Sequence, residues 1–183
     1  NSGYGKIIAT RGTSRWQASE GPEVIYRDGY YYLFLAYGSL SVEYNTRVCR
    51  SRNIDGPYVD IHGNSAMGSA QLYPILTAPY RFDNSYGWVG ISHCGIFDDG
   101  AGNWFYTSQG RFPVNVGGNE YSNAIMMGHV RSIRWDANGW PLVMPERYGA
   151  VPQAPITENE IAGDWEHLAL TTSTGTQRTS ETC

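Results

Sequence analysis

Two stretches of the chain repeat the same hairpin pattern, and this repeat constrains the fold more than any other feature. Residues 22–38 read as a strand, a turn at 27–29 and a second strand rich in tyrosine. Residues 94–110 repeat that order, with a glycine-rich turn at 98–102 before an aromatic strand. Further strand candidates follow each hairpin, at 46–51 and 58–61 after the first and at 124–130 and 132–135 after the second. Four antiparallel strands per unit are typical of a β-propeller blade.

A β-sandwich built from similar hairpins is the alternative, and the repeat alone does not separate the two folds. Composition favours short strands in either case, because the 183 residues include 14 Tyr, 6 Trp and 22 Gly while only 16% are charged. We therefore predict an all-β fold. Only two blades are visible, whereas a propeller needs at least four. The chain also opens without a Met, so we expect the amino-terminal blades elsewhere, on a longer chain or on a second polypeptide.

The character of the sequence changes near residue 152. Residues 151–155 include two prolines, residues 161–170 read as a new strand, and the tail behind them is rich in Ser and Thr. We therefore expect residues 1–152 to form carboxy-terminal blades of a propeller. Residues 153–183 are expected to be a linker and the start of a second β domain.

Charge and hydropathy exclude several classes of partner. The net charge is -4 with no basic run, so the chain lacks the electrostatic signature of a nucleic-acid-binding protein. No stretch approaches the 18 consecutive apolar residues of a membrane span. The three cysteines are widely spaced and form no paired motif, so they predict neither a disulfide framework nor a zinc site. A neutral or mildly charged ligand fits this composition best.

Glu20 is the candidate catalytic residue. It lies beside Gly21 and Pro22 at the start of the first hairpin, where backbone packing can hold a carboxyl in a fixed and partly dry position. Burial of that kind favours the protonated form of a carboxyl, which is the form that a general acid needs. The alternative is a solvated loop carboxylate, the common state of a glutamate.

The surroundings of this glutamate resemble glycoside hydrolase family 43. The segment 18–22, followed by 29–34, 44–48 and 56–58, looks like the blade that carries the general acid in that family. The run 86–97, continuing through 104–111, is similar to the last blade of the family's α-1,5-L-arabinanases, and the resemblance covers residues 16–150. The segment 161–166 looks like the start of the carboxy-terminal β domain of the extracellular two-domain arabinanases.

This resemblance implies a secreted enzyme that hydrolyses arabinan with inversion, on a five-bladed propeller whose cleft crosses the axis. Glu20 matches the general acid of the family. The family's general-base aspartate and its pKa-modulating aspartate belong to earlier blades, which this sequence does not contain. Asp28, Asp98, Asp99 and Asp136 are poor substitutes, because each occupies a turn where aspartate is solvated and structural.

The resemblance also implies a calcium ion. His93 matches a histidine that lies at the propeller axis beneath the active site and binds calcium, whose other ligands are largely water. The alternative for a single histidine is an ordinary core or surface residue, since calcium generally prefers oxygen ligands. Cys94 departs from the family, which often has Asn at that position.

Two further residues are weaker candidates for contact with substrate. Trp16 lies close to Glu20 in the sequence and offers an aromatic face on which a furanose ring can stack. Arg111 ends a strand, and we expect it in a surface ion pair rather than against sugar hydroxyls.

Three functions remain open at this stage. The leading hypothesis is an endo-acting arabinanase. An exo-acting arabinanase or an arabinofuranosidase of the same family differs in a loop that closes one end of the cleft. A non-catalytic carbohydrate-binding propeller fragment is the third, because the chain lacks the base aspartate.

Overall fold

The protein is described from a computed structural model, which covers residues 3, 5–11, 19–40, 43–68, 71–79, 81–82, 85–86, 88–111, 126–150, 157–168 and 178–182. Almost every element in these residues is a strand. The elements are β1 (Glu20–Arg27), β2 (Tyr30–Tyr37), β3 (Asn45–Ser51), β4 (Ile75–Thr77), β5 (Arg81–Phe82), β6 (Ser85–Tyr86), β7 (Gly95–Asp98), β8 (Trp104–Arg111), β9 (Met126–Trp135), β10 (Pro141–Val143), α1 (Glu158–Ile161), β11 (Asp164–Leu168) and β12 (Arg178–Thr182).

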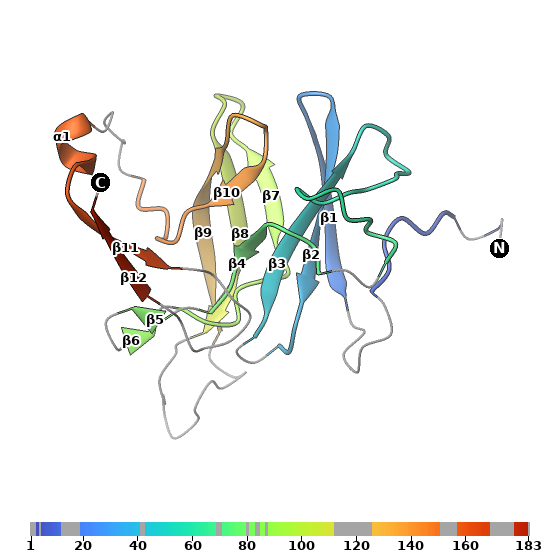
Figure 1. Ribbon diagram of the computed structural model, residues 1–183. Coiled ribbons are helices and arrows are strands. Elements are labelled where there is room, and N and C mark those ends of the chain that lie inside the picture. The colour runs from blue at the N-terminus through green and yellow to red at the C-terminus, as the bar shows by residue number, and fades with distance from the viewer. Residues whose placement is uncertain are drawn as a thin grey trace, which may run out of the picture.

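Two four-stranded antiparallel sheets make up the body of the molecule, one in the order β1-β2-β3-β4 and the other in the order β10-β9-β8-β7. The sheets lie side by side in Figure 1, with β1 next to β7 and β4 next to β10. Each sheet is one blade of the kind that the hairpin repeat predicts. The all-β fold class is therefore confirmed.

Two predicted strands differ in extent from the observed ones. In the first blade, the stretch 58–61 forms only isolated bridges, and β4 supplies the fourth strand instead. The reason is Asp60, whose carboxylate accepts hydrogen bonds from the backbone N–H groups of His62 and Asn64 and so turns the chain. In the second blade, the stretches around 124–130 and 132–135 join into the single strand β9, and β10 after the turn is the fourth strand.

The core of the molecule lies between the two sheets. Alternate residues of each strand point to this interface, as the two-residue period of a strand requires. The buried side chains that meet here are Tyr32, Phe34, Val48, Leu76, Ile91, Cys94, Ile96, Tyr106, Ile133 and Trp140. Burying a large apolar side chain contributes about 1.5–3 kcal/mol, so this shared core fixes the two blades against each other.

A second core covers the opposite face of the first sheet. Leu33, Leu35, Tyr37 and Cys49 point away from the second sheet and pack under the long connection between β3 and β4. Ile8 and Ala9, from the amino-terminal segment, pack against the same cluster. The first blade is therefore covered on both of its faces.

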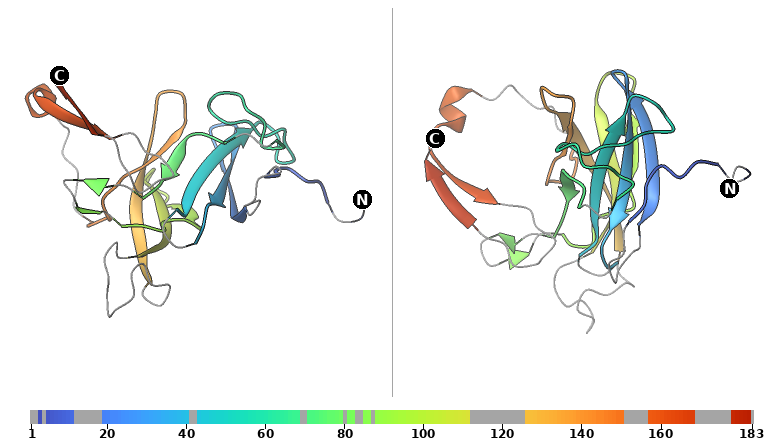
Figure 2. Two further views of the ribbon diagram at one scale, coloured as in Figure 1. Left: turned by 60° about the horizontal axis from the view of Figure 1, so that its bottom comes forward. Right: turned by 45° about the vertical axis from the view of Figure 1, so that its right-hand side comes forward.

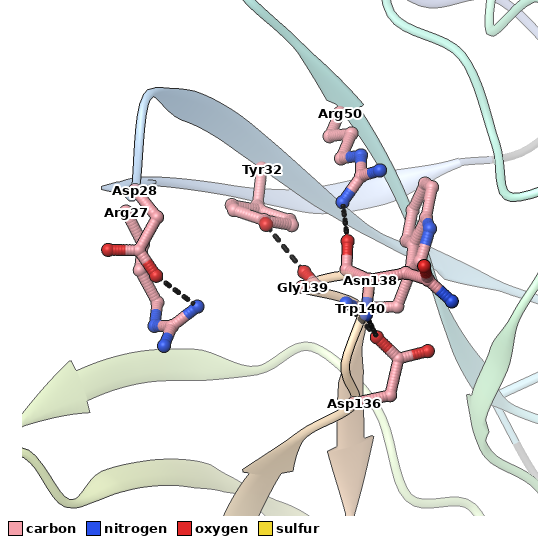
Figure 3. A network of polar contacts seen from close by, with 8 residues as sticks. All are labelled: Arg27, Asp28, Tyr32, Arg50, Asp136, Asn138, Gly139 and Trp140. Atoms are coloured by element: carbon pink, nitrogen blue, oxygen red, sulfur yellow. Dashed lines mark hydrogen bonds and ion pairs between the residues drawn. The ribbon is translucent and has the colours of Figure 1, made fainter.

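A turn of the second blade locks onto the first blade at one end of the interface (Figure 3). The Tyr32 hydroxyl donates to the carbonyl of Gly139 at 2.5 Å, and the Arg50 guanidinium donates to the carbonyl of Asn138 at 2.7 Å. Asp136 closes the turn by accepting hydrogen bonds from the N–H groups of Asn138 and Trp140. We call residues 136–140 the latch turn.

Tyr32→Phe should weaken this lock without leaving a cavity, because it removes only the hydroxyl. We expect the free energy of unfolding to fall by about 1–2 kcal/mol, since the side chain is 1% exposed and the carbonyl of Gly139 loses its donor. Urea denaturation measures the change. Tyr26→Phe is the control, because Tyr26 is 60% exposed and its substitution should change stability by less than about 0.5 kcal/mol. Equal effects of the two substitutions would contradict the role of the lock.

Residues 157–168 and 178–182 form a small unit of one short helix and one hairpin. Helix α1 begins after Thr157, whose backbone N–H and hydroxyl both donate to the Glu160 carboxylate, and β11 pairs with β12. Figures 1 and 2 show this hairpin set apart from the two blades, at the opposite end of the molecule from the amino terminus. The boundary at residue 152 lies outside the described residues and stays a prediction. In the part of the chain that the structure describes, no helix has the length and apolar character needed to cross a bilayer.

Candidate active site

Glu20 opens strand β1, at the edge of the first sheet. It lies opposite Ala36 of β2, which in turn lies opposite Thr46 of β3. The register between β1 and β2 shifts between Glu20 and Glu23, so the chain bends here. Thr46 points to the interface with the second sheet, where it contacts Ser92 and Tyr106. Glu20 therefore lies in the same cross-strand row as Thr46, which is at the junction of the two blades.

The Glu20 side chain is exposed, but one of its oxygens is held. The sequence suggests a partly buried carboxyl, and the described residues do not bury it, because β1 has no neighbouring strand on its outer side. The hydroxyl of Tyr44 donates a hydrogen bond to Oε1 of Glu20. Tyr44 itself is only 2% exposed. The site thus combines an accessible carboxyl with a buried donor that restrains it.

His93 lies against the residue that follows the glutamate. A Cβ atom added at Gly21 would come within 2.8 Å of Cδ2 of the His93 ring. The two residues share an unusual backbone, with φ of +55° at Gly21 and +58° at His93. The structure therefore places the predicted metal ligand against the residue next to the predicted acid, although His93 and Glu20 are 73 positions apart in the sequence. The His93 side chain is exposed.

A chain of buried hydroxyl groups holds the His93 loop in place. The Ser92 hydroxyl, which is completely buried, donates to the carbonyl of Asn45 at 2.9 Å and lies 2.8 Å from the Thr46 hydroxyl. The Thr46 hydroxyl also lies 2.7 Å from the Tyr106 hydroxyl. Residues from both blades therefore fix the backbone on one side of His93.

An open hollow of about 600 Å³ lies beside His93, between the ends of β8 and β9. Its lining combines hydroxyl and amide groups with flexible thioethers, which is suited to an uncharged polar ligand. The lining residues are His93, Thr107, Ser108, Gln109, Met126, Met127, Gly128, His129 and Val130.

His129, which also lines this hollow, is part of the core. It is 3% exposed, and its ring meets that of Trp88 edge-on, with ring centroids 4.3 Å apart. Burial, and then the nearby positive charges of Arg131 and Arg147, lower the pKa of His129 to about 4. The ring is therefore neutral near pH 7. The two cations beside it make this position unfavourable for a metal ion.

The turn aspartates have the structural roles that the sequence predicts. Asp98 and Asp99 accept hydrogen bonds from backbone N–H groups within their own turn, and Asp136 does so in the latch turn. Asp28 forms an ion pair of 2.7 Å with Arg27. None of these four carboxylates is placed to act as a catalytic base with Glu20.

Asp60 is a buried carboxylate that sequence reasoning missed. Burial alone would raise its pKa, but hydrogen bonds from Asn64, Tyr73 and His62 outweigh burial and hold the pKa of Asp60 below its ordinary value. Both oxygens of its carboxylate accept hydrogen bonds from the long connection between β3 and β4. Asp60 is therefore a structural residue, and the spacing of Asp60, His62 and Asn64 was the available signal for such a turn.

Two weaker sequence predictions have different outcomes. The prediction that Arg111 lies at the surface in an ion pair is wrong, because its side chain is completely buried. The cause is a backbone pairing of Arg111 with Val89, at 2.9 and 3.1 Å, which brings the preceding loop over the end of β8. Trp16 lies outside the described residues, so its stacking role stays a prediction.

Gly21→Ala should disturb the packing of the backbone beside Glu20 against the His93 ring. A methyl group there meets the His93 ring and also forces a residue with a side chain into the left-handed region, which costs about 1–2 kcal/mol. We expect lower stability and a displaced His93 ring, measured by thermal unfolding and by the NMR chemical shifts of the imidazole.

Gly100→Ala is the matched control for this prediction. Gly100 has a φ of +74° and nothing within 4 Å of an added Cβ, so it carries the backbone cost without the steric contact. If both substitutions lower stability equally and the His93 shifts do not move, the packing of Gly21 on His93 is not significant.

This chain is similar to a known protein family and to known arabinanases. Residues 2–141 match the family Glycosyl hydrolases family 43. The extracellular endo-α-(1→5)-L-arabinanase 2 of Bacillus subtilis (strain 168) is 30% identical over 186 residues, which cover 90% of this chain and 38% of that protein. The crystal structure of the endo-1,5-α-L-arabinanase from Thermotoga petrophila RKU-1 in complex with TRIS superposes with a TM-score of 0.79 and 28% identity, over 97% of this chain and 42% of that one.

An exo-acting relative matches less of the chain. The extracellular exo-α-(1→5)-L-arabinofuranosidase of Cellvibrio japonicus (strain Ueda107) is 28% identical over 130 residues, which cover 68% of this chain and 33% of that protein. This chain therefore spans about two fifths, or less, of the length of the relatives that it matches.

Proposed function

Because the chain belongs to glycoside hydrolase family 43, we propose that it forms part of a secreted enzyme that hydrolyses the α-1,5 bonds of arabinan, with Glu20 as the general acid. The observation that carries the proposal is the geometry at Glu20, where an accessible carboxyl at a blade edge has one oxygen fixed by a buried tyrosine. The substrate and the extracellular location are supported by the names of the relatives from Bacillus subtilis and Thermotoga petrophila.

In the proposed reaction the acid and a water molecule act on opposite faces of the sugar. Glu20 gives its proton to the glycosidic oxygen as the bond between that oxygen and the anomeric carbon breaks. Water attacks the anomeric carbon from the other face and loses a proton to the general base, so the configuration inverts. The acid and the base of such an enzyme stand about 6.5–9.5 Å apart. We propose that the base is an aspartate outside this chain.

The remaining blades are the proposed partner of this chain. The face of the second sheet that points away from the first exposes apolar side chains, with Phe97 45%, Leu142 48% and Tyr148 47% exposed. Apolar groups gathered on a sheet face are typical of a surface that packs against another element. We infer that amino-terminal blades, on a second polypeptide of the same protein, continue the propeller and supply the base.

Endo action is the preferred form of the proposal. The endo-acting relative from Bacillus subtilis matches 90% of this chain, whereas the exo-acting relative from Cellvibrio japonicus matches 68%. Exo action remains the second candidate, because an exo-acting relative also matches two thirds of this chain. Product analysis separates them, since an endo enzyme releases mixed oligosaccharides from arabinan and an exo enzyme releases one short product.

Glu20→Gln, made in the complete enzyme, should lower the kcat on arabinan by about 10²–10⁴-fold, because the amide cannot donate the proton that the leaving oxygen needs. An aryl arabinoside with an activated leaving group should lose much less, since that group departs without protonation. Steady-state kinetics on both substrates gives the ratio of the two losses.

Glu23→Gln is the matched control for Glu20→Gln, because Glu23 lies on the same strand and undergoes the same chemical change. It should leave both rates near those of the unmodified enzyme. Equal losses on the two substrates in Glu20→Gln would show that Glu20 is not the acid.

A calcium ion at His93 is a further part of the proposal. Among the described residues, no group of three or more His, Cys, Asp or Glu side chains is arranged to hold a metal. At most two such side chains, the exposed imidazole of His93 among them, would therefore hold the ion, which would have to keep most of its water; calcium accepts water among its ligands. Bound there, calcium would supply positive charge close to the acid.

Calcium removal should therefore lower the activity of the complete enzyme, and added calcium should restore it. His93→Ala should weaken calcium binding measured by isothermal titration calorimetry, whereas His62→Ala should not, because His62 lies on the long connection between β3 and β4. Anomalous scattering from a crystal grown with calcium shows the ion directly. A crystal soaked in excess calcium with no ion near the His93 ring would contradict the proposal.

A further inference from the structure

We propose that Tyr44 is a positioning residue for the acid, which holds Oε1 of Glu20 and leaves Oε2 to carry the proton that is transferred. The inference rests on the proposed function in one respect, since it takes Glu20 as the general acid. It adds a residue that acts through Glu20 and does not itself exchange a proton with the substrate.

The sheet register places Tyr44 within reach of the glutamate. Tyr44 precedes β3 and lies two residues before Thr46, on the same side of the sheet. Thr46 lies opposite Ala36, and Ala36 lies opposite Glu20. Since the middle position holds only a methyl group, the long tyrosine side chain can extend across the sheet and donate to Oε1.

The backbone around Tyr44 is firmly held. The Asn45 side-chain amide donates to the carbonyl of Glu43 at 2.7 Å and to that of Tyr37 at 3.1 Å, and Asn45 is 1% exposed. Gly38 has a φ of +87°, and an added Cβ there would lie 2.4 Å from the Glu43 carbonyl oxygen. The two described ends of the connection between β2 and β3, at Gly38 and Glu43, are therefore packed closely together, and the buried phenol has little freedom to move.

The hydrogen bond fixes which oxygen of the acid bears the proton. A protonated carboxyl has one O–H donor, and its other oxygen remains an acceptor. Since the Tyr44 hydroxyl donates to Oε1, the proton of the neutral acid resides on Oε2. In the reaction the Oε2–H bond breaks, the proton passes to the glycosidic oxygen, and Tyr44 keeps its own proton while it donates to the new carboxylate.

The environment of Tyr44 favours this donor role. Burial, and then the hydrogen bond to Glu20, raise the pKa of the Tyr44 phenol well above its ordinary value. The phenol therefore stays protonated at any pH at which the enzyme would work. A glutamate has three rotatable side-chain bonds, so a fixed donor also reduces the number of orientations that the acid explores.

Tyr44→Phe in the complete enzyme tests this inference, because it removes the hydroxyl and retains the ring. We expect kcat on arabinan to fall by about 10–100-fold with little change in KM, since the acid is still present but is no longer held in its productive orientation. The rate on an aryl arabinoside with an activated leaving group should fall much less. This ratio of rates does not depend on how much of the variant is folded.

Tyr58→Phe is the matched control. Tyr58 is a fully buried tyrosine whose hydroxyl donates to the carbonyl of Ile54 at 2.9 Å, in the second core. It loses the same atom at a place remote from Glu20, so the ratio of the two rates should match that of the unmodified enzyme.

The double variant separates the two proposals. If Tyr44 acts through the acid, Tyr44→Phe has no further effect on arabinan hydrolysis in a Glu20→Gln background. If Tyr44→Phe lowers the rates on both substrates equally, the positioning role is overturned while the acid role stands. The same conclusion follows if Tyr44→Phe lowers the rate on arabinan as strongly in the Glu20→Gln background as it does alone. If Glu20→Gln itself spares arabinan hydrolysis, the proposed function fails instead.

Discussion

The hydroxyl of Thr46 is the contact on which the geometry of the site depends. It lies at the junction of the two blades, completely buried, with the hydroxyls of Ser92 and Tyr106 as partners. A buried hydroxyl that loses its partner costs about 1–3 kcal/mol, so these groups favour one arrangement of the two sheets. That arrangement carries the His93 loop to the start of β1. An apolar contact of equal area would bind the blades without specifying their register.

The two ends of the interface have different tasks. At the latch turn, side chains of the first blade bond to carbonyl groups of the second, and the Arg50 guanidinium stacks 4.1 Å from the centre of the Trp140 ring. This end contributes rigidity. At the other end Glu20, the proposed acid, is exposed on an edge strand, with the buried Tyr44 as a donor beneath it. Because the latch turn and the core fix the blades, this end can leave its carboxyl open to a ligand.

Sequence predicted most of the fold because the relevant signals are local. Hairpin turns, aromatic strands and the turn aspartates all depend on interactions within a few residues, and each of them is found where the pattern predicts it. Strand ends were less predictable. The carboxylate of Asp60 binds backbone groups of its own loop and ends the pairing there, whereas β9 continues through a stretch that read as two strands.

The site was predictable only in part, because it is assembled by contacts between residues far apart in the sequence. Glu20 and His93 follow from resemblance, but their proximity is a product of blade packing. Nothing in the sequence near Tyr44 indicates its role. That role depends on its burial, on the strand register that places Ala36 between Thr46 and Glu20, and on the close packing of Gly38 against Glu43. The burial of Arg111 likewise arises from a pairing with Val89 that spans 22 positions. The roles of Trp16 and of calcium remain predictions.

The contact between Gly21 and His93 requires an unfavourable backbone conformation at His93. Both residues are in the left-handed region, which a glycine adopts freely and a histidine adopts at about 1–2 kcal/mol. Such a conformation persists only where its surroundings determine it, and it is frequent at functional sites. Here the neighbours of His93, namely Ser92 and Cys94, are both buried and hold the chain on either side. The imidazole therefore points out of the core and lies against Gly21, the residue after Glu20, which has no side chain to exclude it.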